Sequence, residues 1–139
     1  MPTICIVEDD PVLSFLLEEI CKASGCRVLG TARDLAGASC MLDDAVPDVL
    51  LLDYSLDGGE DGLELLTRAK RDYPAMQTVL ITGWDIDRLA ARIDFIAPDQ
   101  VLQKPVMPQD IIALLGALTE PHREPELIPE FGPEYAKAA

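Results

Sequence analysis

The sequence predicts an α/β fold: a five-stranded parallel sheet with helices on both faces, built from a βα unit repeated five times. Two observations lead to this prediction. Short apolar segments alternate with segments of helical periodicity along residues 3–119. The connections between them are short, which favours right-handed crossovers and hence a parallel sheet. With 139 residues, 49% of them hydrophobic, the chain is long enough to bury one core.

The first βα unit combines a strand at residues 3–7 with a helix that begins at Pro11. The strand is apolar and largely β-branched, and Asp10 stands at the N-cap position before the proline. Ser24-Gly25 ends the helix. Four apolar side chains at helical spacing are expected to face the core: Leu13, Leu16, Leu17 and Ile20.

The second unit has a strand at residues 26–31 and a helix from Asp34, as the N-cap, to about residue 45. Its inward residues are expected to be Leu35, Ala38 and Leu42. The third strand, residues 48–53, is apolar throughout and ends in an acid. A strand that is apolar on both faces is typical of the centre of a parallel sheet.

The third helix follows a loop at residues 54–60, with Asp61 as its expected N-cap and Glu64 completing a capping box. Leu63, Leu66 and Ala69 should face the core, and Arg68, Lys70 and Arg71 the solvent. The remaining strands are expected at residues 77–82 and 99–103, and the remaining helices at 85–94 and 108–119. Four side chains of the last helix are expected to face the core: Ile111, Ile112, Leu115 and Leu118.

Residues 120–139 differ in composition from the rest of the chain. Prolines recur every four residues from Pro121 to Pro133 and alternate with glutamates, a spacing that excludes a regular helix. The sequence therefore predicts a globular domain at residues 1–119 and an extended Pro/Glu-rich tail at 120–139. Docking of the tail and a mobile terminus both remain open.

Charge and cysteine content exclude several classes of function. Eleven basic residues against 25 acidic ones give a net charge of −14, which disfavours binding to nucleic acid or to a membrane surface. No apolar run is long enough to span a membrane, and no signal peptide is recognisable, so we expect a cytoplasmic protein. The spacing of the four cysteines is not that of a zinc site, and all four are expected to be buried, reduced thiols.

Polar side chains stand at the carboxyl ends of four of the five predicted strands. Glu8 and Asp9 follow the first strand, Asp53 ends the third, Thr82 ends the fourth and Lys104 follows the fifth. Carboxyl ends of parallel strands meet at one edge of a sheet, which is where ligands bind in such folds. Converging carboxylates repel one another, and Mg²⁺ would relieve that repulsion. A carboxylate beside Mg²⁺ can accept a phosphoryl group, with a lysine and a hydroxyl near the phosphoryl oxygens.

The chain resembles the receiver domains of two-component response regulators. Five stretches carry the resemblance: Ile4–Pro11, Val49–Asp53, Asp61–Leu65, Val79–Gly83 and Val101–Pro105. The resemblance implies a flavodoxin-like, doubly wound fold without enzymatic activity beyond its own phosphorylation and dephosphorylation. It implies that Asp53 is the phospho-acceptor, and that Thr82 and Lys104 are the conserved hydroxyl and lysine. Glu8, Asp9, Asp53 and the carbonyl of Ser55 are then the Mg²⁺ ligands. A cis Lys104-Pro105 peptide is also common in the family.

The family resemblance also implies partners. A histidine kinase or a histidine phosphotransfer protein would supply the phosphoryl group, and a downstream protein would be bound in response. The fourth and fifth helices with the fifth strand would form a homodimer surface.

Some features depart from the family pattern and keep an alternative open. Val101 stands where the family usually has an aromatic switch residue, and the loop after Asp53 is one residue longer than usual. Residues 120–139 predict only the Pro/Glu-rich tail, so we expect no output domain in this stretch. The alternative is an interaction module with a receiver fold that works without phosphorylation. A Mg²⁺-dependent phosphatase is less favoured because the D-x-D run is absent, and no phosphate-binding glycine motif for nucleotides is present.

Overall fold

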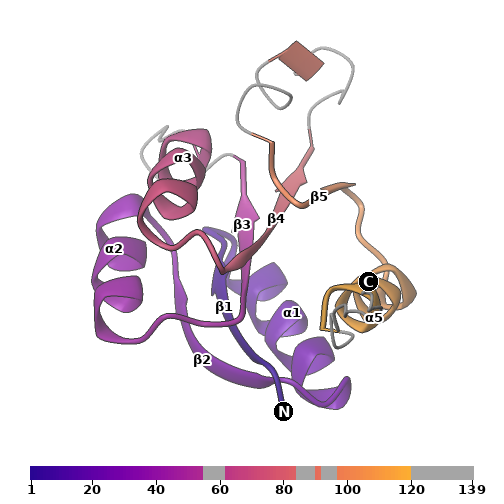
Figure 1. The fold of residues 1–139 in the computed structure, drawn as a ribbon. Helices are drawn as coiled ribbons and strands as arrows, with labels where there is room; N and C mark the ends of the chain where they lie inside the picture. The colour runs from indigo at the N-terminus through magenta and orange to yellow at the C-terminus, as the bar shows by residue number, and fades with distance from the viewer. Residues whose placement is uncertain (55–61, 84–89, 92–96, 120–139) are drawn as a thin grey trace, which may run out of the picture.

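A computed structural model shows the predicted α/β architecture (Figure 1) and describes residues 1–54, 62–83, 90–91 and 97–119. Five parallel strands form one sheet in the order β2-β1-β3-β4-β5. The strands are β1 (Thr3–Val7), β2 (Arg27–Ala32), β3 (Val49–Asp53), β4 (Gln77–Thr82) and β5 (Gln100–Gln103). The described helices are α1 (Pro11–Ala23), α2 (Leu35–Asp44), α3 (Gly62–Asp72) and α5 (Pro108–Thr119).

Helices cover both faces of the sheet and enclose two hydrophobic clusters. Helices α1 and α5 lie on one face and α2 and α3 on the other (Figure 1). Leu17 and Ile111 belong to the cluster on the α1/α5 face, while Leu42 and Leu66 belong to the cluster on the α2/α3 face. All five residues of β3 are buried, which confirms it as a central strand with an apolar environment on both sides.

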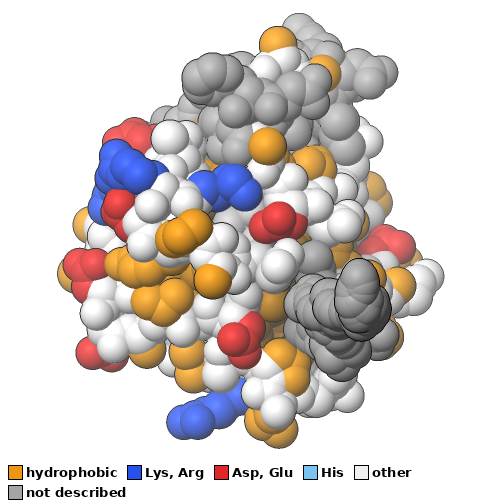
Figure 2. Space-filling view, viewed as in Figure 1, with side chains coloured by type: hydrophobic (Ala, Val, Ile, Leu, Met, Phe, Trp, Pro, Cys, Tyr) orange, Lys and Arg blue, Asp and Glu red, His pale blue; other side chains and the backbone are white. Residues whose placement is uncertain are grey.

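The local signals in the sequence position the helices as predicted. Asp10 caps α1, its Oδ1 accepting hydrogen bonds from the N–H groups of Val12 and Leu13 at 2.9 and 3.3 Å. Asp34 caps α2 by accepting from the N–H of Gly37 at 2.7 Å. The predicted bounds of β4 and α5 are confirmed to the residue. Basic side chains gather beside α3 (Figure 2), whose last turn carries Lys70 and Arg71.

Three predictions of burial are wrong. Leu16 and Ile112, expected to face the core, are 49% and 53% exposed. Each adjoins a buried residue, Leu17 or Ile111, because the apolar stripe in the sequence is wider than the line along which the helix touches the sheet. Cys40 is exposed as well, whereas Cys5, Cys21 and Cys26 are buried as expected.

Several predicted features lie outside the described residues. These are most of the expected helix at 85–94, the Asp61 cap, the loop that contains Ser55, and the tail at 120–139. The dimer surface implied by the family resemblance therefore falls only partly within them. No helix among the described residues is long and apolar enough to cross a membrane.

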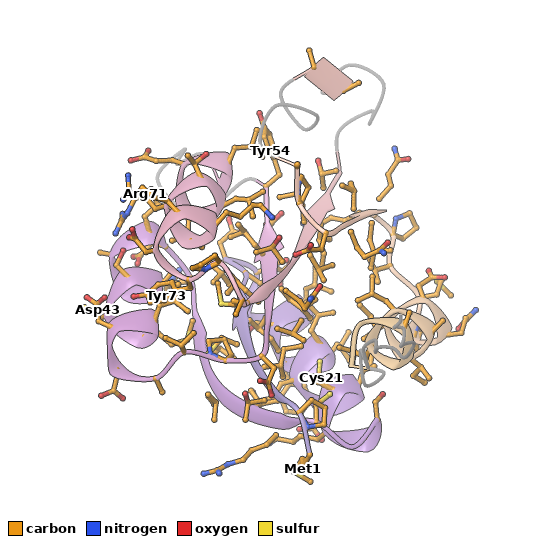
Figure 3. The ribbon with its side chains drawn as sticks, in the orientation of Figure 1. Met1, Cys21, Asp43, Tyr54, Arg71 and Tyr73 are labelled. Atoms are coloured by element: carbon orange, nitrogen blue, oxygen red, sulfur yellow. The ribbon has the colours of Figure 1, made fainter. Side chains whose placement is uncertain are left out.

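The strand order places a switch point between β1 and β3. The chain moves outward in one direction from β1 to β2, and in the other direction from β3 to β4 and β5. Open parallel sheets bind ligands at the carboxyl edge beside such a point. Tyr54, directly after β3, lies at this edge, and Met1 lies at the opposite end of the molecule (Figure 3).

Candidate functional site

Three carboxylates converge at the carboxyl edge of β1 and β3. Glu8 follows β1, and Asp53 is the last residue of β3; the two strands pair in register up to Val7 and Leu52. Asp9 completes the cluster, with one carboxylate oxygen from each residue within 4.8 Å of the others. Glu8 and Asp53 are each only 3% exposed. The convergence predicted from the strand ends is therefore confirmed.

Lys104 brings a positive charge to the buried carboxylates. Its Nζ lies 3.3 Å from Asp53 Oδ1 and 3.8 Å from Glu8 Oε1. The lysine follows β5, two strands away from β3. Its backbone N–H donates to the carbonyl of Thr82 at 2.8 Å. The Lys104-Pro105 peptide is cis, as the family resemblance implied.

Thr82 lies fully buried at the carboxyl end of β4. Since β4 is the strand between β3 and β5, this residue stands between the strand ends that carry Asp53 and Lys104. Ser55, the fourth implied Mg²⁺ ligand, lies outside the described residues. Besides Asp53, the sequence predicted five site residues. The structure describes four of them: Glu8, Asp9, Thr82 and Lys104.

Gly62 is a residue of the site region that sequence reasoning missed. Helix α3 begins at Gly62 against the backbone that follows β3, where its N–H donates to the carbonyl of Tyr54. A β-carbon at position 62 would collide with the carbonyl oxygen of Asp53 and approach that of Tyr54 to 2.9 Å. A glycine directly after an expected N-cap was the available signal. Only a residue without a side chain lets α3 start this close to Asp53.

Burial gives Glu8 unusual acid–base behaviour. Desolvation, as the largest cause, and the charge of Asp53 together raise its pKa to about 8, against the opposing effects of the hydrogen bond from the Asp10 N–H and the charge of Lys104. Glu8 Oε2 accepts from that N–H at 3.1 Å. Glu8 Oε1 is buried without a hydrogen-bond partner. Burial therefore favours the protonated form of Glu8 in the metal-free protein.

This pKa predicts a pH-dependent stability. Below about pH 4.5, Glu8 is protonated in both the folded and the unfolded chain; between about 4.5 and 8, only the folded chain keeps the proton. We expect the contribution of Glu8 to the free energy of unfolding to fall as pH rises through this window. Urea unfolding in EDTA would measure it, with Glu8→Gln as the control. A difference between the two proteins that does not change with pH would contradict the prediction.

The donor set fits a hard divalent cation. Glu8 Oε1 has no hydrogen-bond partner, and the three carboxylate groups lie close together beside Lys104. Carboxylates held this close repel one another, and a bound cation would relieve that repulsion. Oxygen ligands of this kind, with room for water at the half-buried Asp9, are those that Mg²⁺ prefers. Receiver domains bind Mg²⁺ through such acidic residues.

The fold and the acidic edge are those of a receiver domain, and comparison with known proteins agrees. The chain belongs to the response regulator receiver domain family, whose model matches residues 4–116. Among similar proteins is the nitrogen assimilation regulatory protein NtrX of Azorhizobium caulinodans, 40% identical over 81 residues, which are 58% of this chain and 18% of that one. The transcriptional regulatory protein AruR of Pseudomonas aeruginosa is 32% identical over 119 residues, covering 81% and 47%.

Solved structures show the same relationship. The receiver domain of NtrX from Brucella abortus aligns with a TM-score of 0.76 at 26% identity, covering 84% of this chain and 98% of that one. A CheY-like receiver domain from Methanospirillum hungatei aligns with a TM-score of 0.77 at 24% identity, covering 86% and 95%, a likeness of fold. The chain spans about a fifth to a half of the length of the curated relatives above. Receiver domains are generally regulatory.

Proposed function

We propose that this protein is a response regulator receiver that accepts a phosphoryl group on Asp53 and changes its binding to a partner as a result. The observation that carries the proposal is the Lys104 Nζ, 3.3 Å from Asp53 Oδ1, within a cluster of buried carboxylates. A carboxylate held beside a lysine and a cluster of metal-binding oxygens is suited to phosphoryl transfer, which depends mainly on positioning and charge neutralisation.

In the proposed reaction, a carboxylate oxygen of Asp53 attacks the phosphorus of a phosphohistidine. A P–O bond forms, the P–N bond breaks, and the imidazole leaves with the electron pair and takes up a proton. Asp53 has to be ionised for this step, and the adjacent ammonium group of Lys104 favours the ionised form.

Each remaining residue has a separate role in the proposal. Lys104 neutralises one phosphoryl oxygen, and the Thr82 hydroxyl donates to another. Glu8, Asp9, Asp53 and the Ser55 carbonyl would hold Mg²⁺, which when bound neutralises negative charge on the phosphoryl oxygens. The proton on Glu8 must leave before that carboxylate can bind a cation, so Mg²⁺ binding should release a proton.

The proposed phosphoryl donor is a histidine kinase or a histidine phosphotransfer protein. Beside the acidic cluster, Glu8 and Asp9 line an open hollow of about 520 Å³ between α1 and the start of α2, together with Phe15 and Arg33. Val12, Phe15 and Leu16 expose apolar surface on α1 at 67%, 59% and 49%. Exposed apolar side chains next to a reactive carboxylate favour docking of another protein at this end of α1.

Intact-mass analysis after treatment with acetyl phosphate and Mg²⁺ tests the proposal. We expect the mass of one phosphoryl group to be added to the wild-type protein and none to Asp53→Asn, because the amide is not a nucleophile at phosphorus. Omitting Mg²⁺ should slow the addition strongly. Absence of the adduct in the wild type, or its persistence in Asp53→Asn, would refute the proposed function.

Val101 favours a second candidate, an interaction module that works without phosphorylation. It is half-buried against the α2/α3 cluster and pairs with Leu80. Because the residue is a valine, the aromatic ring that the family usually has at this position is missing. Partner capture with the wild type and with Asp53→Asn, each with and without acetyl phosphate, separates the candidates. Equal binding in all four conditions would favour the second.

We further propose that the receiver unit spans residues 1–119, with residues 120–139 as an extension of it.

A further inference from the structure

Two matching Thr–Asp contacts join neighbouring strands at the edge of the sheet opposite the site. In the first, Asp48 Oδ2 accepts from the N–H and the hydroxyl of Thr3 at 2.9 and 3.1 Å, and the Asp48 N–H donates to that hydroxyl oxygen at 2.9 Å. In the second, Asp99 Oδ2 accepts from the N–H and hydroxyl of Thr78 at 2.7 and 3.1 Å, and the Asp99 N–H donates to the hydroxyl oxygen at 3.2 Å. We call them the Thr3–Asp48 and Thr78–Asp99 clamps.

Each clamp lies one residue before the first paired residues of two neighbouring strands, and the site lies at the opposite end of those strands. The β1/β3 ladder starts at Ile4 and Val49, one residue after the Thr3–Asp48 clamp. The β4/β5 ladder starts at Val79 and Gln100, one residue after the Thr78–Asp99 clamp. Asp53 lies five residues after Asp48, and Lys104 five residues after Asp99. Register at the clamp is therefore transmitted along a short strand to the functional residue.

The Thr78–Asp99 clamp has the greater influence because β5 is an edge strand of four residues. Its sequence is Gln-Val-Leu-Gln, with both apolar residues half-buried. Val101 packs against one hydrophobic cluster and Leu102 against the other. A slip by one residue would exchange two apolar side chains between two apolar faces, so hydrophobic pattern alone specifies the register weakly. The same slip would move Lys104 by about 3.3 Å along the strand.

The Thr3–Asp48 clamp has less influence on strand register. β1 and β3 are interior strands, each paired on both sides, and a slip of either would have to break two ladders. The start of β3 is also held from β4, where the Gln77 N–H donates to the Asp48 carbonyl at 2.9 Å. The two clamps share three hydrogen bonds, and in the first the Asp48 N–H also donates to the Thr3 carbonyl at 3.1 Å. They differ as well in the pairing that holds each strand.

We infer that Asp99, through its clamp on Thr78, is a positioning residue that sets the register of β5 and so holds the Lys104 ammonium group at Asp53. This inference rests on the proposed function for its effect on phosphorylation. Thr78 is fully buried, which makes its hydroxyl a fixed anchor for the exposed Asp99. Asp99 itself does not contact the reacting groups and acts through Lys104.

The test compares Asp99→Ala with Asp48→Ala, its matched control, in acetyl phosphate phosphorylation with saturating Mg²⁺. We expect Asp99→Ala to lower the rate roughly ten- to a hundredfold, since misplacement by an ångström or more has effects of that size. Asp48→Ala should stay near the wild-type rate under conditions where both variants are fully folded. Asp99→Asn should restore most of the rate, because one amide oxygen can accept both Thr78 hydrogen bonds.

Two further measurements separate positioning from a loss of stability. In a Lys104→Ala background, Asp99→Ala should cause no further loss of rate, because its effect passes through the lysine. The Mg²⁺ dissociation constant should change no more in Asp99→Ala than in Lys104→Ala, because the lysine affects Mg²⁺ binding only through its charge and is not a metal ligand. An equal loss of rate with and without Lys104 would overturn the inference.

A readout without phosphoryl transfer keeps this inference distinct from the proposed function. The chain has four lysines, so ¹³Cε-lysine NMR gives few signals, and Lys104→Ala identifies the one of interest. Asp99→Ala should shift the Lys104 signal, and Asp48→Ala should not. An unmoved signal in Asp99→Ala would refute the inference. Failure of the wild type to accept a phosphoryl group would refute the proposed function alone, and the NMR result would still decide the role of Asp99.

Discussion

Replacing Lys104 with alanine is expected to slow phosphorylation of Asp53 by roughly a hundredfold or more while leaving the fold intact. Loss of one positioned charge at a transferring group has effects of about that size. The lysine side chain is 32% exposed, and its Nζ lies 3.3 Å from Asp53 Oδ1 and 3.8 Å from Glu8 Oε1. Its removal also raises the pKa of Glu8 further, because the Lys104 charge lowers that pKa in the native protein. Protonation of Glu8 would then compete more strongly with Mg²⁺.

Circular dichroism and the rate of mass increase with acetyl phosphate measure the two halves of this prediction. Lys22→Ala is the matched control: it also removes one positive charge, from an ion pair with Glu18 on the surface of α1. We expect Lys22→Ala to phosphorylate like the wild type, because an exposed pair contributes little. An unfolded Lys104→Ala protein, or one with an unchanged rate, would contradict the role given to this lysine.

Replacing Gly62 with alanine is expected to destabilise the fold by roughly 1–3 kcal/mol, the usual cost of inserting a methyl group where there is no room. The added carbon would meet the carbonyl oxygens of Asp53 and Tyr54, which are backbone atoms and cannot rotate away as a flexible side chain would. Relief requires α3 to move away from β3, which shifts the backbone that carries Asp53. We therefore expect slower phosphorylation as well as lower stability.

Gly116 supplies the control for this substitution. It lies within α5, and a β-carbon built there meets nothing within 4 Å. Gly116→Ala should stabilise the protein by roughly 0.5–1 kcal/mol, because alanine is the better helix former. Urea unfolding of both variants measures the contrast. A Gly62→Ala protein as stable as the wild type would show that α3 can be displaced at little cost.

Local signals in the chain were sufficient for most of the fold. Apolar periodicity located the strands, and Asp10 with Pro11 located the start of α1, because both depend on residues that are close in sequence. The parallel arrangement followed from the βα alternation, and the convergence of Glu8, Asp53 and Lys104 at one edge followed from that arrangement.

Periodicity did not predict which of two adjacent apolar residues would be buried. It favoured Leu16 and Leu17 equally, yet one is half-exposed and the other 2% exposed, because the angle at which α1 crosses the sheet selects between them. The same limit applies to Ile112 beside Ile111. Such outcomes depend on the packing of elements that are distant in sequence.

The amino-acid sequence was enough to establish the strand–helix alternation and the residues that reach the carboxyl edge. The folded arrangement was needed for the orphaned Glu8 oxygen, the absence of space for a side chain at Gly62, and the bond from Thr78 to Asp99. These three features involve contacts across strands or between a strand and a helix. Their geometry depends on strand register and close packing, where a shift of one residue or one ångström matters. The hydrophobic pattern of a sequence does not resolve differences of that size.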